Sequence, residues 1–502
     1  MTKMEEEFIV ETTKGKVLGY FNRGVIKFKG IPYAAPPIGN LRFKPTVPIK
    51  PWEVIFDATK YGPVAPQPPS ALENMFSDPL PSSEADCLTL NIWTQGLDNN
   101  KRPVMFWIHG GAFVTGSGRA LDGSRLVLRG DVVVVSINYR LGILGFLYRE
   151  DVPDLCPNVG LIDMVTALKF VKDNISRFGG DPDNITIFGE SAGGSAVACL
   201  LAMPSAKGLF HRAILQSQAT NKYGLNPSRG NRHYEIMMEK LGLEKGDIDS
   251  LRELPIEKII EVSERFEIIQ FDNPRAGPVI DKEILQKNPL EAVKDGYIKD
   301  IDLFIGSNLD ETRLWSMWAP KGEKMTTEGL IKSIDALLKL IGRNGTKARE
   351  IIEIYKKRHK NPSDINDAIF TDYMFHVPSI RLAEEQSKHQ KNTFMYLFTW
   401  ETPIEGGRFG AMHALELAFV FNILLDRDIG IFPRKTEETQ GLSEKMMDAW
   451  IAFARSGNPN HDNIPELLPY DIQKRATIIF DKEVTIQYDP YGNERKSWEG
   501  IL

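Results

Sequence analysis

Apolar runs alternate with segments of helical period through the middle of the chain. Residues 102–110 and 131–140 contain continuous apolar runs, which are typical of strands buried on both faces of a sheet. Residues 161–180 carry apolar side chains at a helical spacing and end in two glycines. A further strand at 184–189 and a small-residue helix at 191–203 follow. This order of strands and helices predicts a mainly parallel sheet with helices on both faces.

Shorter patterns flank this region. Residues 8–37 alternate apolar and polar positions around turn signals, which predicts short antiparallel strands. Two more central strands are expected at 213–217 and 302–308. Residues 220–300 and 320–390 are mostly helical in period, and we expect them to cover the sheet as a cap.

The composition limits the class of protein. Hydrophobic residues make up 42% of the chain, which is enough to bury a large core and excludes disorder. The 61 Lys and Arg residues against 67 Asp and Glu give a net charge of −6, which argues against nucleic acid or an anionic membrane as a partner. No apolar stretch reaches the ~20 residues of a membrane span. We predict a single α/β domain over residues 1–502, with a central mostly parallel sheet flanked by helices, a small N-terminal antiparallel sheet and helical cap insertions.

The N-terminus and the cysteines bear on location. Residues 5–7 are three acids, where a signal peptide would be basic and then apolar. The cysteines are Cys87, Cys156 and Cys199, an odd number with no metal-ligand spacing. We therefore expect a cytoplasmic protein with no disulfide and no structural zinc site.

A candidate nucleophile lies between the strand and the helix of 184–203. Residues 189–193, Gly-Glu-Ser-Ala-Gly, match the pattern G-x-S-x-G of a nucleophile elbow. On so sharp a turn a side chain at either glycine would collide with backbone, and the hydroxyl of Ser191 would be exposed. The alternative is a Gly-rich turn without chemistry, but the flanking strand and helix favour the elbow.

Donors for a developing oxyanion are expected on an earlier turn. Residues 109–113, His-Gly-Gly-Ala-Phe, directly follow a predicted strand, as an HGGG-type element does. Small side chains let backbone N–H groups approach an oxyanion at ~2.7–3.1 Å. We predict the N–H groups of Gly111 and Ala112 as donors, with Gly110 as a further candidate. Ala192, at the start of the next helix, adds another.

Longer stretches resemble the type-B carboxylesterase family, which includes the cholinesterases and has the α/β-hydrolase fold. The matching stretches are 28–45, 83–93, 138–146, 158–194 and 207–217. In character the chain is closest to the bacterial para-nitrobenzyl esterase-like carboxylesterases. The resemblance implies hydrolysis of carboxylic esters through an acyl-enzyme on Ser191, without a metal or organic cofactor.

The resemblance also implies the other members of a catalytic triad. The order expected for this fold is Ser, acid and then His. The family's strand and following Asp-Glu pair imply Glu311 as the acid, although spacing alone leaves Asp310 almost equal. The family's loop entering a helix implies His413 as the base among eight histidines. Ser217 resembles a serine that hydrogen-bonds the acid, with an ordinary strand-end serine as the alternative, and Glu190 is expected to support the site beside the nucleophile.

A helix is expected to continue from the acid through residues 312–318. Leu314 and Trp315 would then share a face with Glu311, and aromatic residues at matching positions line the gorge of cholinesterases. We predict that both line the substrate pocket, with core packing as the alternative for Trp315 and as the expectation for Trp318.

Two departures from the family pattern bear on the location and the substrate of the protein. Ala65 stands where secreted members carry the disulfide partner of Cys87, which supports an intracellular location. The loop before Cys87 has no tryptophan for stacking on choline, so acetylcholine is not the expected substrate.

The predicted activity is hydrolysis of small aryl and alkyl esters with short to medium acyl chains, by a monomer or weak homo-oligomer. One alternative is a non-catalytic, partner-binding relative of the same fold. The other is an amide or thioester hydrolase that uses the same triad.

Overall fold

The chain folds into two compact units. The computed structural model describes residues 8–70, 81–218, 225–266, 276–317, 325–425 and 433–502. The first unit comprises Met1–Ile214, Gly224–Ile301 and Ala454–Ser456, and the second comprises Leu215–Tyr223, Asp302–Phe453 and Gly457–Leu502. The single domain expected over residues 1–502 stays a prediction.

The first unit is built on a sheet with the strand order β10-β9-β7-β8-β6-β4-β3. Its strands are β3 (Tyr20–Asn22), β4 (Val25–Pro32), β6 (Thr89–Thr94), β7 (Arg102–Ile108), β8 (Val133–Ile137), β9 (Gly180–Glu190) and β10 (Arg212–Gln216). β7 pairs in parallel with both β8 and β9, whereas β3, β4 and β6 join antiparallel at the edge. Every residue of β7 and β8 is buried, as their continuous apolar runs predict.

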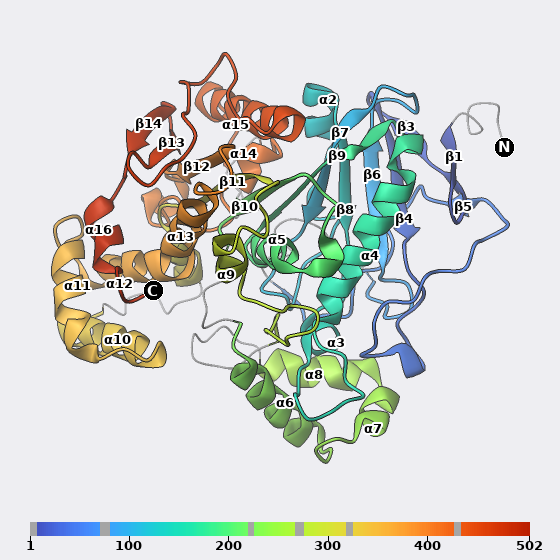
Figure 1. Ribbon diagram of the computed structural model, residues 1–502, viewed down its shortest axis with the longest axis horizontal. Coiled ribbons are helices and arrows are strands. Elements are labelled where there is room, and N and C mark those ends of the chain that lie inside the picture. The colour runs from blue at the N-terminus through green and yellow to red at the C-terminus, as the bar shows by residue number, and fades with distance from the viewer. Residues whose placement is uncertain (1–7, 71–80, 219–224, 267–275, 318–324, 426–432) are drawn as a thin grey trace. The chain divides into compact units, whose positions relative to one another are not determined.

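The helices of this unit pack on the sheet or on one another. They are α2 (Ser124–Gly130), α3 (Gly142–Phe146), α4 (Val159–Asn174), α5 (Ala192–Ala202), α6 (Pro227–Leu241), α7 (Ile248–Glu253), α8 (Ile256–Phe266) and α9 (Pro289–Lys294). α4 and α5 pack against β9 and lie in front of the strands in Figure 1, while α2 packs against β6 and β8. α5 is made of small and aliphatic residues and is buried along its whole length, so it can approach the sheet closely. α6, α7 and α8 share an apolar cluster with α3, which agrees with the helical cap expected in this region.

A small N-terminal sheet is also present, but it is not purely antiparallel as predicted. β1 (Ile9–Thr12) and β2 (Gly15–Leu18) form an antiparallel hairpin. β5 (Phe56–Asp57) then pairs with β2 in parallel. The prediction missed this strand because it comes from a later segment rather than from the neighbouring turn.

The second unit carries the strand order β14-β13-β12-β11. Its strands are β11 (Asp302–Asn308), β12 (Thr393–Phe398), β13 (Ala476–Phe480) and β14 (Thr485–Tyr488). β11, β12 and β13 are parallel, and β14 closes the edge antiparallel. Its helices are α10 (Thr327–Leu340), α11 (Ala348–Tyr355), α12 (Pro362–Thr371), the π-helix η7 (Asp372–His376), α13 (Val377–Gln386), α14 (Leu417–Val420), α16 (Gly492–Ser497) and all but the last three residues of α15 (Glu437–Ser456). Along the residues described, no helix is both long and apolar enough to span a membrane.

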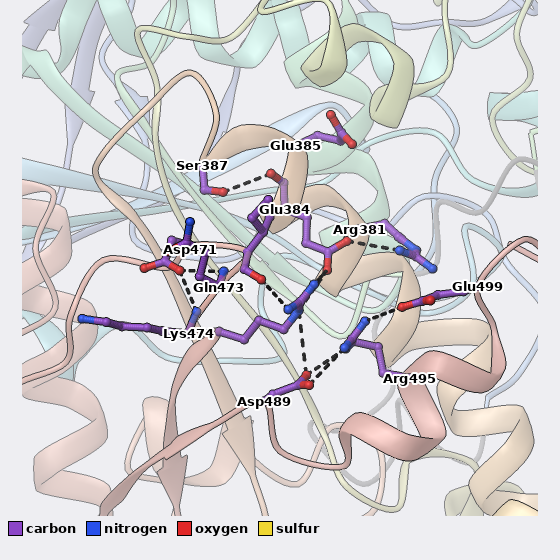
Figure 2. A network of polar contacts seen from close by, with 12 residues as sticks. Arg381, Glu384, Glu385, Ser387, Asp471, Gln473, Lys474, Asp489, Arg495 and Glu499 are labelled. Carbon is purple, nitrogen blue, oxygen red and sulfur yellow. Dashed lines mark hydrogen bonds and ion pairs between the residues drawn. The ribbon is translucent and has the colours of Figure 1, made fainter.

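A charged network joins α13 to the C-terminal segment within this unit (Figure 2). Glu384 on α13 pairs with Arg381 at 3.2 Å and with Arg475 at 2.9 Å. Arg495 on α16 pairs with Asp489 at 2.8 Å, through one of two hydrogen bonds to that carboxylate. Glu384 and Arg495 are both buried, so the network holds charge inside the protein as well as on its surface.

Candidate active site

Ser191 occupies a strained turn between β9 and α5. Its φ of 58° and ψ of −121° lie in a region that side chains other than glycine rarely adopt, at a typical cost of about 1–3 kcal/mol. A Cβ at Gly189 would lie 2.6 Å from the carbonyl carbon of Gly193, and a Cβ at Gly193 would lie 2.1 Å from the oxygen of Ile108. Both glycines are therefore required by the space around the turn. This strand–turn–helix backbone is the kind of turn expected of a nucleophile elbow.

The loop after β7 lies against this turn. A Cβ at Gly110 would come within 3.2 Å of the Cβ of Ser191 and 3.1 Å of the carboxylate of the buried Glu190. Gly111 and Ala112 both have positive φ, 100° and 57°. Across the described part of the chain, the N–H groups of the four predicted donors donate to no protein acceptor: Gly110, Gly111, Ala112 and Ala192. Four N–H groups without an internal acceptor suit an oxyanion hole.

His109 supports this loop, a role that the sequence did not reveal. Its Nδ1 donates to the carbonyl of Gly110 at 2.8 Å, and its ring stacks on Tyr139 with centroids 4.4 Å apart. The hydroxyl of Tyr139 donates to the His109 carbonyl at 2.9 Å. Burial lowers the pKa of His109 to about 4, so the ring is neutral near pH 7 and acts as a fixed hydrogen-bond donor.

Within the second unit, Glu311 and His413 form a buried acid–base pair. Oε2 of Glu311 lies 2.5 Å from Nδ1 of His413, and both side chains are at most 3% exposed. Oε1 accepts the N–H of Asn308 at 2.8 Å, and the N–H of His413 donates to the carbonyl of Glu311 at 3.2 Å. The carboxylate is thus fixed through both oxygens, which orients the imidazole.

The neighbouring Asp310 is engaged elsewhere. Its Oδ2 accepts the N–H of Ala411 at 3.1 Å, and its Oδ1 lies 3.2 Å from the guanidinium of Arg313. Spacing alone left Asp310 and Glu311 nearly equal, and the geometry favours Glu311 as the partner of His413.

The hydrogen bond expected from Ser217 to the triad acid is absent. Among the described residues, the buried Oγ of Ser217 has no hydrogen-bond partner, while its N–H donates to the carbonyl of Gly306 at 2.8 Å. Asn308 and His413 already engage both oxygens of Glu311, so a third donor is not needed to fix it. Ser217 fits the alternative of a strand-end serine.

A second buried acid, Glu416, belongs to the same network. Asn308 donates to its Oε2 at 2.6 Å and Gln216 to its Oε1 at 3.1 Å. Burial, and then the nearby charge of Glu311, raise the pKa of Glu416 to about 7. The sequence offered one signal for the role of Glu416, its position three residues after His413.

Two aromatic rings hold the imidazole of His413. Trp315 lies 5.3 Å and Phe375 4.9 Å from it, centroid to centroid. Glu311–Met317 forms a 3-10 helix, η5, rather than the predicted α-helix. Trp315 remains partly exposed, whereas Leu314 is 1% exposed and packs in the core, so Trp315 is the better candidate for the pocket. Trp318 lies outside the described residues.

Metal ligands do not gather in the described ranges. No group of three or more His, Cys, Asp or Glu side chains there has an arrangement that could hold a metal ion. Cys87, Cys156 and Cys199 are all free thiols.

The chain is similar to known enzymes over nearly its whole length. The model of the carboxylesterase family matches residues 6–498. The chain belongs to the carboxylesterase family. It is a carboxylic ester hydrolase, and its fold is the α/β-hydrolase fold, with mostly parallel strands and flanking helices.

Relatives of this carboxylesterase match over nearly their whole length. The para-nitrobenzyl esterase of Bacillus subtilis (strain 168) is 38% identical, over 97% of this chain and 98% of its own. The phenmedipham hydrolase of Pseudarthrobacter oxydans is 35% identical, over 95% of each chain. Among solved structures, a PNB esterase matches with a TM-score of 0.86 at 36% identity, covering 98% of this chain and 99% of its own. A Geobacillus stearothermophilus carboxylesterase matches with 0.87 at 37% identity, covering 98% and 100%.

Proposed function

We propose that this carboxylesterase works through a Ser191–His413–Glu311 triad and an acyl-enzyme. The observation that carries the proposal is the strained backbone of Ser191, held between two glycines that admit no side chain. Strain of this kind persists where the surrounding structure supports it, commonly at reactive residues. The buried pair of Glu311 and His413 adds the acid and base that the hydroxyl needs.

The proposed reaction has two halves. His413 takes the proton of Ser191 as the hydroxyl oxygen attacks the ester carbonyl, and Glu311 stabilises the imidazolium that forms. Because Nδ1 is engaged with Glu311, proton exchange falls to Nε2. The N–H groups of Gly111, Ala112 and Ala192 would receive the oxyanion, with Gly110 as a further candidate. His413 then protonates the leaving alcohol, and water repeats the sequence on the acyl-enzyme.

The proposed substrates are small aryl and alkyl esters with short to medium acyl chains. Two relatives are named for para-nitrobenzyl esters and for phenmedipham, so the first panel should contain both. A series of para-nitrophenyl esters from acetate to laurate would then give the preferred chain length. Amides and thioesters of the same acyl groups should be assayed beside them, because the triad would be identical.

The decisive experiment uses four variants. Ser191→Ala and His413→Ala should reduce ester hydrolysis to background, and Glu311→Gln should lower kcat by roughly 10³–10⁴-fold, as the loss of an orienting acid does. Asp310→Asn is the matched control and should retain most of kcat, because Asp310 bonds Ala411 and Arg313. Turnover by a clean Ser191→Ala preparation would rule out the mechanism, and a crippled Asp310→Asn would reassign the acid.

We propose that the protein acts in the cytoplasm as a monomer or weak homo-oligomer. Three free thiols suit a reducing compartment.

A further inference from the structure

Gln67 makes three hydrogen bonds to backbone, and two of them go to one residue. Its Oε1 accepts the N–H of Gly116 at 2.8 Å, and its Nε2 donates to the carbonyl of Gly116 at 3.0 Å. Nε2 also donates to the carbonyl of Ala65 at 3.0 Å. One amide side chain therefore satisfies both backbone groups of Gly116, as a neighbouring strand would.

The segment that carries Gln67 is itself fixed. The carbonyl of Pro63 accepts Nδ2 of the buried Asn138 at 3.1 Å. The carbonyl of Val64 accepts the N–H of Ser83 at 3.1 Å. Gln67 therefore extends from an anchored strand-like segment, which allows it to hold another part of the chain in place.

Gly116 in turn ends the loop that carries the proposed oxyanion donors and packs against the start of that loop. A Cβ there would be 2.4 Å from Nδ1 of His109 and 2.5 Å from the carbonyl oxygen of Gly110. Its φ of 112° is also closed to most side chains. A displacement of Gly116 would move the peptide at Gly110, where an added Cβ would lie only 3.2 Å from the Cβ of Ser191.

The loop needs external support. Gly111, Ala112 and Phe113 follow one another with φ of 100°, 57° and 63°. Left-handed conformations of residues other than glycine cost of order 1–3 kcal/mol each, and they persist only where neighbours enforce them. Within the loop, the carbonyl of Gly111 accepts the N–H groups of Val114 and Thr115, both at 2.9 Å. Gly116 is the next residue, at which the loop leaves this turn.

We infer that Gln67 is a positioning residue, which aims the N–H groups of Gly111 and Ala112 at the oxyanion by clamping Gly116. The inference rests on the proposed function, since it assigns those groups to the transition state. Gln67 touches no reacting atom in this scheme. Its loss should therefore weaken transition-state stabilisation and leave the affinity for the ground-state ester nearly unchanged.

The test compares Gln67→Met with the wild type. Methionine is of similar length but can neither donate to nor accept from Gly116. We expect kcat for para-nitrophenyl acetate to fall about 10–100-fold with KM within about threefold. This fall is smaller than the one caused by removing a whole oxyanion donor.

An aliphatic trifluoromethyl ketone provides a second readout. Ser191 Oγ bonds to its carbonyl carbon, the hydroxyl proton passes to His413, and the carbonyl π electrons become the oxyanion. Its inhibition constant should rise by the same factor as kcat/KM falls.

Gln95→Met is the matched control in the same unit. Gln95 is also partly buried, and its Nε2 donates to the carbonyl of Val127 at 2.8 Å. The control should lower the thermal midpoint but leave kcat and ketone inhibition within about twofold of wild type, because it does not reach the loop. If Gln67→Met also retains kcat within twofold, or loses activity only through KM, Gln67 has no positioning role.

A second variant of Gln67 and independent tests of Ser191 separate failure of the clamp from failure of the proposed function. If Gln67→Met does not fold, Gln67→Glu is judged by the same criteria, because its carboxylate still accepts the N–H of Gly116 but has no amide to donate. Ser191→Ala and ketone inhibition of the wild type report on the proposed function independently. Turnover by Ser191→Ala would defeat that function whatever Gln67 does, whereas an inert Ser191→Ala with a fully active Gln67→Met would defeat only the clamp.

Discussion

At the scale of single residues, Glu416 illustrates how the fold controls a proton. Its carboxyl is buried between donors from Asn308 and Gln216, near Glu311 and His413, and its pKa is raised from 4.5 to about 7. The folded protein therefore keeps a proton at pH values where the unfolded chain has lost it. The stability that this proton contributes is complete below about pH 4.5 and is lost as the pH rises through 7.

Replacing Glu416 by Gln should remove this pH dependence. Relative to the variant, the wild type should lose about 2 kcal/mol of unfolding free energy between pH 5 and pH 8. Urea unfolding of both proteins at pH 5, 6, 7 and 8 measures the difference. Asp372, whose pKa burial also raises to about 7, is present in both proteins and cancels. Parallel stability curves for the two proteins would mean that Glu416 is already ionised in the folded state at pH 5.

At the scale of elements, η5 and η7 together hold the imidazole of His413. Trp315 on η5 is partly exposed and stacks on the imidazole, and the buried Phe375 on η7 packs against both rings. Trp315→Ala should therefore open space beside the site and shift preference toward longer or bulkier esters by about 1–3 kcal/mol in relative kcat/KM. The acetate-to-laurate profile, normalised to acetate, measures this shift.

Phe375→Ala is the comparison that separates pocket from core. Since Phe375 is 2% exposed, its truncation should cost about 3–5 kcal/mol of stability with an unchanged chain-length profile. If Trp315→Ala gives that same pattern, a large loss of thermal midpoint and no shift in preference, then Trp315 is a core residue.

The elements also show where prediction from the sequence succeeds. Strands β7, β8 and β9 follow from their apolar runs, and the turn at Ser191 follows from its glycines, because both depend on local chemistry. The 3-10 geometry of η5 was not predictable, because a helical pattern along the chain does not include tertiary contacts such as that of Glu311 with His413. Strands β12 to β14 all lie beyond residue 390, where the sequence led to no strand prediction.

Supporting side chains were harder to predict than those proposed to react. The proposed triad of Ser191, Glu311 and His413 belongs to motifs that can be read along the chain. Gln67 and Phe375 belong to no such motif, since each acts on a segment far away in sequence, Gly116 for one and His413 for the other. A single sequence does not reveal such tertiary pairs. Such pairs can be identified only from interatomic distances in the structure.

At the scale of the whole molecule, the charged network of Figure 2 bears on the cooperativity of unfolding. Glu384 on α13 bonds Arg475, which precedes β13, so it joins a helix that packs on β11 and β12 to the C-terminal strands. Its side chain is 9% exposed, while the side chains of its partners Arg381 and Arg475 are 23% and 20% exposed. The partners can therefore recover some hydration when the carboxylate is removed.

Glu384→Gln should destabilise the protein more than the same change at the next residue. Breaking a fully buried ion pair costs roughly 3–5 kcal/mol, and the partly exposed arginines should reduce this to about 1–3 kcal/mol. Glu385 pairs with Lys388 at the surface, so Glu385→Gln should cost at most about 1 kcal/mol.

Thermal and urea unfolding of both variants, followed by tryptophan fluorescence and by residual esterase activity, would measure the difference. Because neither residue contacts His413 or Glu311, kcat at 20 °C should stay at the wild-type value in both. Equal midpoints for the two variants would show that the network contributes no more than an ordinary surface pair. In Glu384→Gln alone, the fluorescence signal of the folded state could be lost before the esterase activity. That result would show that the C-terminal strands unfold separately from the site in this variant.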